Sequence, residues 1–372
     1  MGRESRVDID MLLDNNLLGN AHPEYDDTAV VEAYKKNDPS NLSEKDKFVY
    51  KTAKKVIEDV ITKDMSDYEK ELAIYNWQYS YIHYNNDAFV DVAEFTAAPE
   101  ENNRDKAEKT NSPKNNTNNG ESRNKNNNAT QETDIDAEKD EIAKSDPYGE
   151  NYDYEPYGVL KFHEAICVGN ATTFKLFMDM LDIPCKLVHS VEEGEHCWNL
   201  VKIDGDWYHT DITFDGGEFK PAYTNFNVTD NFKIGDYPWD TTKFPAAKAT
   251  KYNYAAKNAI SVPDVYSLPK AIKKAMDEDT IYLYISVDEK NTINSDSLSE
   301  IESRLSSIFP SGTFYSQEIN LSEDEVYYML QIIKDVGTLK DKDDDYKGDS
   351  ENVTIDYDKL NNEFDNVFES VG

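Results

Sequence analysis

The sequence predicts an α+β fold in which helices pack on an antiparallel sheet, and two stretches carry this prediction. Residues 165–181, AICVGNATTFKLFMDML, are typical of an amphipathic helix because their apolar residues recur on one face. That face holds Ala171, Phe174, Phe177, Met178 and Leu181. Residues 196–203 and 207–214 are rich in β-forming residues and flank the turn signal Asp204-Gly205, so they predict a hairpin.

Cys167 stands at the start of the predicted helix. Backbone N–H groups at a helix N-terminus, together with the positive end of the helix dipole, favour a thiolate over a thiol. The position therefore predicts a reactive cysteine. Asp182-Ile183-Pro184 is expected to end the same helix, because the residue before a proline disfavours helical backbone angles.

The hairpin is expected to bring a histidine and an acid to one face. With Asp204-Gly205 as a two-residue turn, residues 196, 198, 211 and 213 share a face. His196 and Asp211 then become diagonal neighbours, roughly 7–8 Å apart between their backbones. A slip of one residue would move one of the two to the other face. A thiol, a histidine base and an orienting carboxylate are the groups that covalent amide chemistry needs.

Three blocks of sequence carry a family resemblance, and three weaker segments extend it. The blocks are residues 167–171 (CVGNA), 196–199 (HCWN) and 204–211 (DGDWYHTD), and the weaker segments are residues 65–84, 227–230 and 237–240. Together they resemble the transglutaminase-like superfamily of papain-like folds, in particular its bacterial members. The resemblance implies a transglutaminase-like core of helices packed on an antiparallel sheet.

The resemblance also implies roles for single residues. Cys167 is expected to be the nucleophile, His196 the general base and acid, and Asp211 the group that orients the imidazole. Four positions depart from the usual residues of the family: His163 replaces Gly, Asn170 replaces Tyr, Cys197 replaces Ala and Phe214 replaces Trp. None of these changes removes a member of the triad. The candidates for lining the substrate cleft are Trp198, Asn170, His163 and Tyr157, the last from a tyrosine-rich run before the nucleophile.

The chain divides by composition into several parts. We expect an N-terminal arm at 1–42, a transglutaminase-like domain at 43–250, a small α/β module at 264–337 and an acidic tail at 338–372. Capping signals at Ser43 and Ser66 each predict a helix start. A polar, Asn-rich stretch at about 100–145 predicts a disordered insertion, because it holds too little apolar surface to offset the entropy of ordering. In the module we expect helices at 267–276, 298–309 and 323–336 and strands at 281–287 and 312–319.

Charge and cysteine content limit the possible partners. The chain has 39 Lys and Arg against 74 Asp and Glu, a net charge of −35, which repels nucleic acid and anionic membrane and favours a cationic protein or peptide partner. The sequence contains no run of about 18 apolar residues, so it predicts no membrane-inserted helix. We expect no cofactor and no metal. Asp341, Asp343 and Asp345 begin a calcium-loop pattern, but Tyr346 and Asn352 stand where that pattern needs other residues. Cys185 and Cys197 are interpreted as small buried residues.

Two functions remain open at this point. The first is cysteine-dependent amide chemistry through a thioester, either hydrolysis as in a peptidase or deamidase, or transfer to an amine as in a transglutaminase. The second is a catalytically silent surface binding or adhesion module on the same fold. The first residues lack the apolar core of a signal peptide. We expect an extracellular or cell-surface bacterial protein whose export signal is absent from this sequence, with a cytoplasmic protein as the alternative. The oligomeric state is left open.

Overall fold

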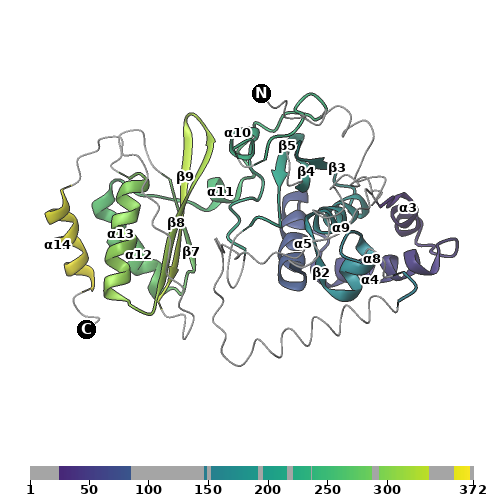
Figure 1. Ribbon diagram of the computed structural model, residues 1–372, viewed down its shortest axis with the longest axis horizontal. Coiled ribbons are helices and arrows are strands. Elements are labelled where there is room, and N and C mark those ends of the chain that lie inside the picture. The colour runs from purple at the N-terminus through teal and green to yellow at the C-terminus, as the bar shows by residue number, and fades with distance from the viewer. Residues whose placement is uncertain are drawn as a thin grey trace, which may run out of the picture.

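The structure is a computed structural model that describes residues 25–84, 146–148, 152–191, 196–215, 221–235, 237–286, 293–334 and 356–368. The predicted insertion at about 100–145 lies outside the described residues. Two lobes lie side by side in Figure 1: one is built around helices α3, α4, α5, α8 and α9, and the other around helices α12, α13 and α14. Helices α10 (Asp230–Lys233) and α11 (Tyr254–Asn258) lie between the two lobes.

The capping signals give the expected helices of the first lobe. Helix α4 (Glu44–Val60) begins after Ser43, whose side chain accepts a hydrogen bond from the N–H of Asp46 at 3.0 Å. Helix α5 (Asp67–Tyr81) begins with a capping box between Ser66 and Glu69. Both predicted helix starts are confirmed. The physical reason is that these hydrogen bonds satisfy N–H groups that a helix end would otherwise leave without partners. Helix α3 (Thr28–Lys36) packs into the same hydrophobic core.

The predicted cysteine helix is confirmed as α9 (Cys167–Met180), and it is preceded by α8 (Pro156–Phe162). Aromatic side chains of α5 pack edge to face against it: Tyr75 on Phe174 with ring centroids 6.2 Å apart, and Trp77 on Phe177 at 5.3 Å. These aromatics belong to the core of the lobe. Burial of this large apolar area fixes α9 against the rest of the domain.

An antiparallel sheet of three strands covers α9, in the order β3 (Cys185–His189), β4 (Cys197–Ile203) and β5 (Asp206–Thr210). The predicted two-residue turn is confirmed, since Ile203 pairs with Asp206 and the turn residues Asp204 and Gly205 have φ of 55° and 98°. The α+β class is likewise confirmed. A separate pair of two-residue strands, β1 (His83–Tyr84) and β2 (Glu164–Ala165), runs parallel beside the start of α9.

The second strand of the hairpin is shorter than predicted, because it ends at Thr210. The backbone N–H of Asp211 donates to the carbonyl of Asn225 at 2.9 Å instead of continuing the ladder with β4. Asp211 therefore lies at the point where the chain leaves the sheet, and the segment that follows determines its surroundings.

The second lobe has a four-stranded sheet in the order β6-β7-β9-β8, covered on one side by helices. Its elements are β6 (Ile260–Ser261), η1 (Val265–Ser267), α12 (Leu268–Asp277), β7 (Tyr282–Ser286), α13 (Ser295–Ile308), β8 (Thr313–Ser322), β9 (Glu325–Ile333) and α14 (Tyr357–Phe368). Within the predicted acidic tail, α14 buries Leu360, Phe364 and Phe368 in the core of this lobe.

The helix predicted at 323–336 is wrong. This segment forms β9, which lies between β7 and β8 and pairs antiparallel with both. Its apolar residues Val326, Met329, Leu330 and Ile333 have helical spacing, but Tyr327, Tyr328 and Ile332 interleave them and favour a strand. Pairing on both edges decides the outcome, because a central strand satisfies all of its backbone groups within the sheet.

The sheet of the second lobe packs on the chain segment that follows the hairpin. Thr229 donates its hydroxyl hydrogen to the carbonyl of Leu321 at 2.6 Å, and the hydroxyl of Tyr284 donates to the carbonyl of Ala222. Apolar side chains from both lobes form one buried cluster that includes Ala222, Val228, Ala255, Tyr282, Tyr284, Ile319, Leu321 and Met329. Residues 221–233 are therefore held in place by both lobes.

Glu71 is a buried carboxyl of α5 that accepts hydrogen bonds from Asn227 Nδ2 at 2.8 Å and Thr210 Oγ1 at 3.2 Å. Burial raises the pKa of Glu71 from 4.5 to about 8, although these two hydrogen bonds lower it. Because the folded state binds this proton more tightly, the stability that Glu71 contributes is fully present below pH 4.5 and is lost as the pH rises through 8.

Glu71→Gln should remove this titration and keep the shape of the hydrogen-bonded group. We expect the free energy of unfolding of the variant, relative to that of the natural chain, to increase steadily from pH 4.5 to 8. Urea denaturation at a series of pH values measures this difference. A difference that stays constant over the whole range would contradict the prediction.

Candidate active site

The N-terminus of α9 is fixed against the loop before α8. The N–H of Ile166, which precedes the helix, donates to the carbonyl of Asp153 at 3.1 Å. That carbonyl also lies against Gly169, where an added Cβ would be 2.0 Å from the oxygen. Only glycine permits this approach, so the first turn of α9 and its Cys167 are held close to the loop.

The thiol of Cys167 is 6% exposed and lies against Cys197 and Ala171. Burial raises the pKa of this thiol to about 12, and backbone N–H groups of Cys197 and Val168, which donate hydrogen bonds to the sulfur, lower it only in part. The expectation that the helix start makes Cys167 a thiolate is therefore wrong for this state of the protein. Desolvation of the charged form outweighs the helix N-terminus.

His196 and Asp211 form a buried pair on the hairpin. The alternation of side chains along the two strands predicts that these residues are neighbours. Nε2 of His196 is 2.7 Å from Oδ2 of Asp211, and the two side chains are 4% and 1% exposed. Oδ1 of Asp211 accepts hydrogen bonds from the N–H groups of Thr213 at 3.1 Å and Phe214 at 3.3 Å. Because Asp211 accepts at Nε2, the imidazole proton belongs on that nitrogen and Nδ1 carries the lone pair.

Cys167 lies close to this pair. Its sulfur accepts a hydrogen bond from the N–H of Cys197, the residue that directly follows His196, and the charge of Asp211 contributes to the raised pKa of the thiol. Cys167, at the start of α9, therefore lies against the backbone of the residue that follows His196.

Lys233 is a buried residue of the site that the sequence did not reveal. Its Nζ is 2.6 Å from Oδ2 of Asp211 and 0% exposed, and the aromatic rings of Trp198 and Tyr237 lie 5.1 and 5.7 Å from it. Burial alone would raise the pKa of Asp211, but Lys233 and then His196 hold it well below its ordinary value. No spacing or periodicity points to Lys233, because it lies on a four-residue helix whose place depends on both lobes.

Aromatic rings surround the imidazole of His196. The rings of Trp198, Phe214 and Tyr237 lie 5.7, 4.5 and 4.6 Å from it between centroids. Trp198 is fixed by its indole N–H, which donates to Nδ1 of His209 at 2.9 Å. Phe214 is 46% exposed, so its ring forms an apolar surface beside His196 that a substrate can contact.

The other cleft candidates lie in different surroundings. Asn170 is buried one turn after the cysteine, and its Nδ2 donates to Oγ1 of Thr213 at 3.3 Å. His163 ends α8 with φ of 65°, a conformation that favours the glycine usual in the family, and its ring packs on Tyr81 at 3.9 Å. Tyr157 is buried in the core of the lobe, where its hydroxyl donates to Asp146 at 2.9 Å.

Tyr84 of β1 is a second residue that sequence reasoning missed. Its hydroxyl oxygen accepts a hydrogen bond from the backbone N–H of Cys167. Burial raises the pKa of Tyr84, and the charges of Cys167 and Tyr237 add to this rise. The short parallel pairing of Tyr84 with Ala165 carries the side chain to this place, and no motif in the sequence predicts that pairing.

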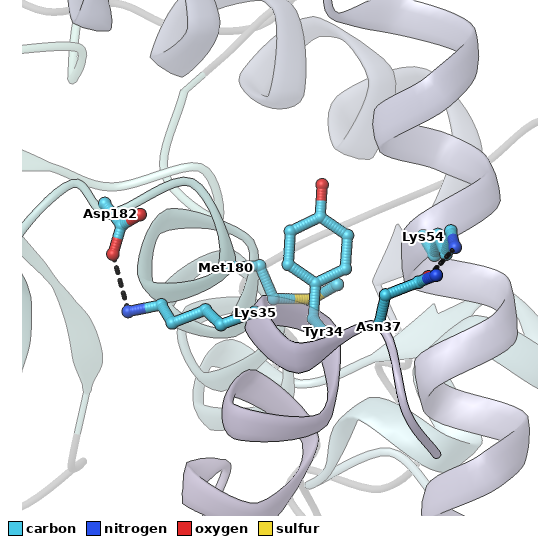
Figure 2. A pocket seen from close by; sticks show the side chains of 6 residues that line it. All are labelled: Tyr34, Lys35, Asn37, Lys54, Met180 and Asp182. Atoms are coloured by element: carbon cyan, nitrogen blue, oxygen red, sulfur yellow. Dashed lines mark hydrogen bonds and ion pairs between the residues drawn. The ribbon is translucent and has the colours of Figure 1, made fainter.

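A separate surface pocket contains none of the triad or cleft candidates. Figure 2 shows Tyr34, Lys35, Asn37, Lys54, Met180 and Asp182 around it, with Lys35 paired to Asp182 at 2.5 Å and Lys54 donating to Asn37 at 2.6 Å. Lys35 and Asp182 are exposed and form an ion pair, and Lys54 bonds to the amide of Asn37. Among the described residues, no group of three or more His, Cys, Asp or Glu could hold a metal ion. In the same residues, no helix is long and apolar enough to span a membrane.

Comparison with known proteins gives a family match over the site. Residues 115–212, which include Cys167, His196 and Asp211, match the model of the Transglutaminase-like superfamily. None of the curated proteins compared with the chain matches it. A solved structure described as "Crystal structure of a TGase" is similar to 50% of this chain with 17% sequence identity and a TM-score of 0.27, and the chain spans 38% of that structure's length. The family match confirms the superfamily resemblance that the sequence motifs indicate.

Proposed function

We propose, on the premise that residues 115–212 match the transglutaminase-like superfamily, that this protein performs cysteine-dependent amide chemistry on a papain-like core. Cys167 is the nucleophile, His196 the base and acid, and Asp211 the orienting group. The observation that carries the proposal is the buried pair of His196 and Asp211, joined at 2.7 Å, together with the hydrogen bond that the N–H of the next residue, Cys197, donates to the sulfur of Cys167.

The geometry supports a sequence of proton transfers. Nδ1 of His196 accepts the thiol proton as Cys167 Sγ bonds to the carbonyl carbon of a carboxamide or peptide. Breaking of the C–N bond leaves a thioester on the sulfur, and the same imidazole returns the proton to the leaving nitrogen. Water then releases an acid, or a primary amine releases a new amide. We favour hydrolysis, as a peptidase or deamidase would perform it.

The substrate is a protein or peptide segment. The apolar ring of Phe214, exposed beside His196, offers contact to an uncharged side chain near the scissile amide. The net charge of −35 attracts cationic segments more strongly than acidic ones. Among peptides of equal length, a cationic glutamine-containing peptide is therefore the favoured substrate.

The second candidate function is a catalytically silent surface binding or adhesion module. Its support is the thiol itself, since Cys167 is only 6% exposed and burial raises its pKa to about 12. A buried thiol of this kind reacts slowly unless substrate binding exposes it.

Alkylation in the presence of substrate distinguishes the two functions. The protein is treated with iodoacetamide near neutral pH, the modified cysteines are mapped by mass spectrometry, and release of ammonia or uptake of an amine is followed on the same samples. We expect loss of turnover to parallel modification of Cys167. Cys185 is the internal control, because it is similarly buried but lies on β3 with Asn199 Nδ2 3.5 Å from its sulfur.

Two results would decide against catalysis. If Cys167 reacts no faster than Cys185 and no amide substrate is turned over, the silent module is the better description. If turnover persists after complete alkylation of Cys167, the proposed nucleophile is wrong.

A further inference from the structure

A second histidine, His209, connects the hairpin to α10. Its Nδ1 accepts the indole hydrogen of Trp198 at 2.9 Å, and its Nε2 is 2.9 Å from Oδ1 of Asp230, the first residue of α10. Because an indole N–H can only donate, Nδ1 is the accepting nitrogen and Nε2 the one that donates to the carboxylate. The side chain of His209 is 1% exposed. We call this chain of two hydrogen bonds the indole link.

The far end of the indole link has a fixed place. Oδ2 of Asp230 accepts the backbone N–H of Ala247 at 3.1 Å, and the backbone N–H of Asp230 donates to the carbonyl of Ala247 at 2.7 Å. The preceding residue, Thr229, caps α10 and donates its hydroxyl hydrogen to the carbonyl of Leu321 in the second lobe at 2.6 Å. The place of this carboxylate therefore depends on both lobes.

The near end of the indole link lies against the candidate base. The rings of Trp198 and His196 are nearly parallel, with 18° between their planes and 5.7 Å between their centroids. Trp198 is 1% exposed, whereas Phe214, another ring beside His196, is 46% exposed. A buried ring that is packed on all sides and held by a hydrogen bond restricts its neighbour more than an exposed ring does.

Helix α10 contacts the candidate pair from two directions. Lys233, three residues after Asp230, has its Nζ 2.6 Å from Oδ2 of Asp211. The same turn of helix reaches the ring of His196 through the indole link. His196 lies just before β4 and Asp211 just after β5, so one short helix supports both ends of their 2.7 Å contact.

We propose that His209 is a positioning residue for the amide chemistry described above: it connects Trp198 to α10 and thereby keeps the imidazole of His196 in line with Asp211. Trp198 supports that imidazole from within the protein. The inference rests on the proposed function for the reaction that the positioned imidazole serves. The link itself is a matter of geometry, and its first test needs no substrate.

The test uses Asp230→Ala, which removes the far end of the indole link and leaves both rings intact. Asp240→Ala is the matched control, because Asp240 is 27% exposed against 31% for Asp230 and pairs with Lys243 on the surface. NMR at a single pH measures the NOEs between the ring hydrogens of Trp198 and His196 and the solvent exchange of the Trp198 indole hydrogen. We expect Asp230→Ala to reduce the NOEs by about half and to speed the exchange about tenfold. Asp240→Ala should change neither.

Turnover measures what the link does for the reaction. The kcat of Asp230→Ala should fall about tenfold while KM stays within about twofold, since a misplaced base slows the chemical step without removing a substrate contact. Trp198→Phe keeps an aromatic ring but removes the indole hydrogen, and should lower kcat in the same way. Both residues act through His209, so the double variant should lose little more than either single variant. Losses that multiply would mean independent roles and would overturn the proposal.

Unchanged NOEs and unchanged indole exchange in folded Asp230→Ala would also overturn it. The natural chain provides a test even if that variant does not fold. Its Trp198 indole hydrogen should exchange more slowly than that of Trp207, whose side chain is only partly buried, and equal rates would contradict a fixed link. Absence of amide turnover would count against the proposed function alone, since the NOE and exchange measurements need no substrate.

Discussion

Cys167→Ala is expected to reduce amide turnover to the uncatalysed background, a loss of roughly 10⁴-fold or more. The thioester needs this sulfur, and alanine leaves no atom to attack the carbonyl. His196→Ala should lower the rate by roughly 10²–10⁴-fold, because the same imidazole activates the thiol and protonates the leaving nitrogen. Ammonia release from glutamine peptides and cleavage of peptide bonds are the two assays.

Cys185→Ala is the matched control for this experiment. Cys185 is 8% exposed, close to the 6% of Cys167, and its substitution removes an equally buried sulfur. We expect Cys185→Ala to keep most of the turnover while losing stability, as other truncations of buried side chains do. Full activity of Cys167→Ala toward every substrate of the natural chain would refute the mechanism.

Asp211→Ala is expected to destabilise the fold by about 3–5 kcal/mol, because it leaves the buried Lys233 without a counter-charge. The ion pair joins the hairpin to α10 at 2.6 Å and is closed to water. The sequence alone predicts that Asp211 only orients the imidazole. On that basis, its removal should mainly slow the reaction. With Lys233 beside it, loss of stability should accompany loss of rate, and urea denaturation measures the stability directly.

The companion variant is Asp211→Leu combined with Lys233→Met. Replacing both charges with apolar groups removes the unpaired charge, so we expect the double variant to recover much of the lost stability while remaining inactive. Lys251→Ala breaks the exposed ion pair with Asp204, in which the two charged atoms lie 2.7 Å apart, and should leave the thermal midpoint nearly unchanged. If Asp211→Ala unfolds at the same urea concentration as the natural chain, Lys233 is not held by this charge.

The sequence by itself determined the features that depend on neighbours along the chain. Ser43 and Ser66 mark helix starts because their side chains bond to N–H groups within the next turn. Asp204-Gly205 sets a two-residue turn, and the alternation of a strand then carries His196 and Asp211 to one side. These local rules gave the hairpin, the cysteine helix and the pairing of two of the three predicted triad residues.

The tertiary structure decided what depends on distant segments. Strand β9 has an apolar spacing that also suits a helix, and only its pairing with β7 and β8 makes it a strand. Burial reversed the expected effect of the helix start on Cys167, since desolvation depends on what covers a thiol and not on its place in the chain. Lys233 reaches Asp211 because the second lobe packs on the segment that carries it. Periodicity in the sequence does not reveal a charge that is buried by packing between lobes, because the residues that bury it are far away along the chain.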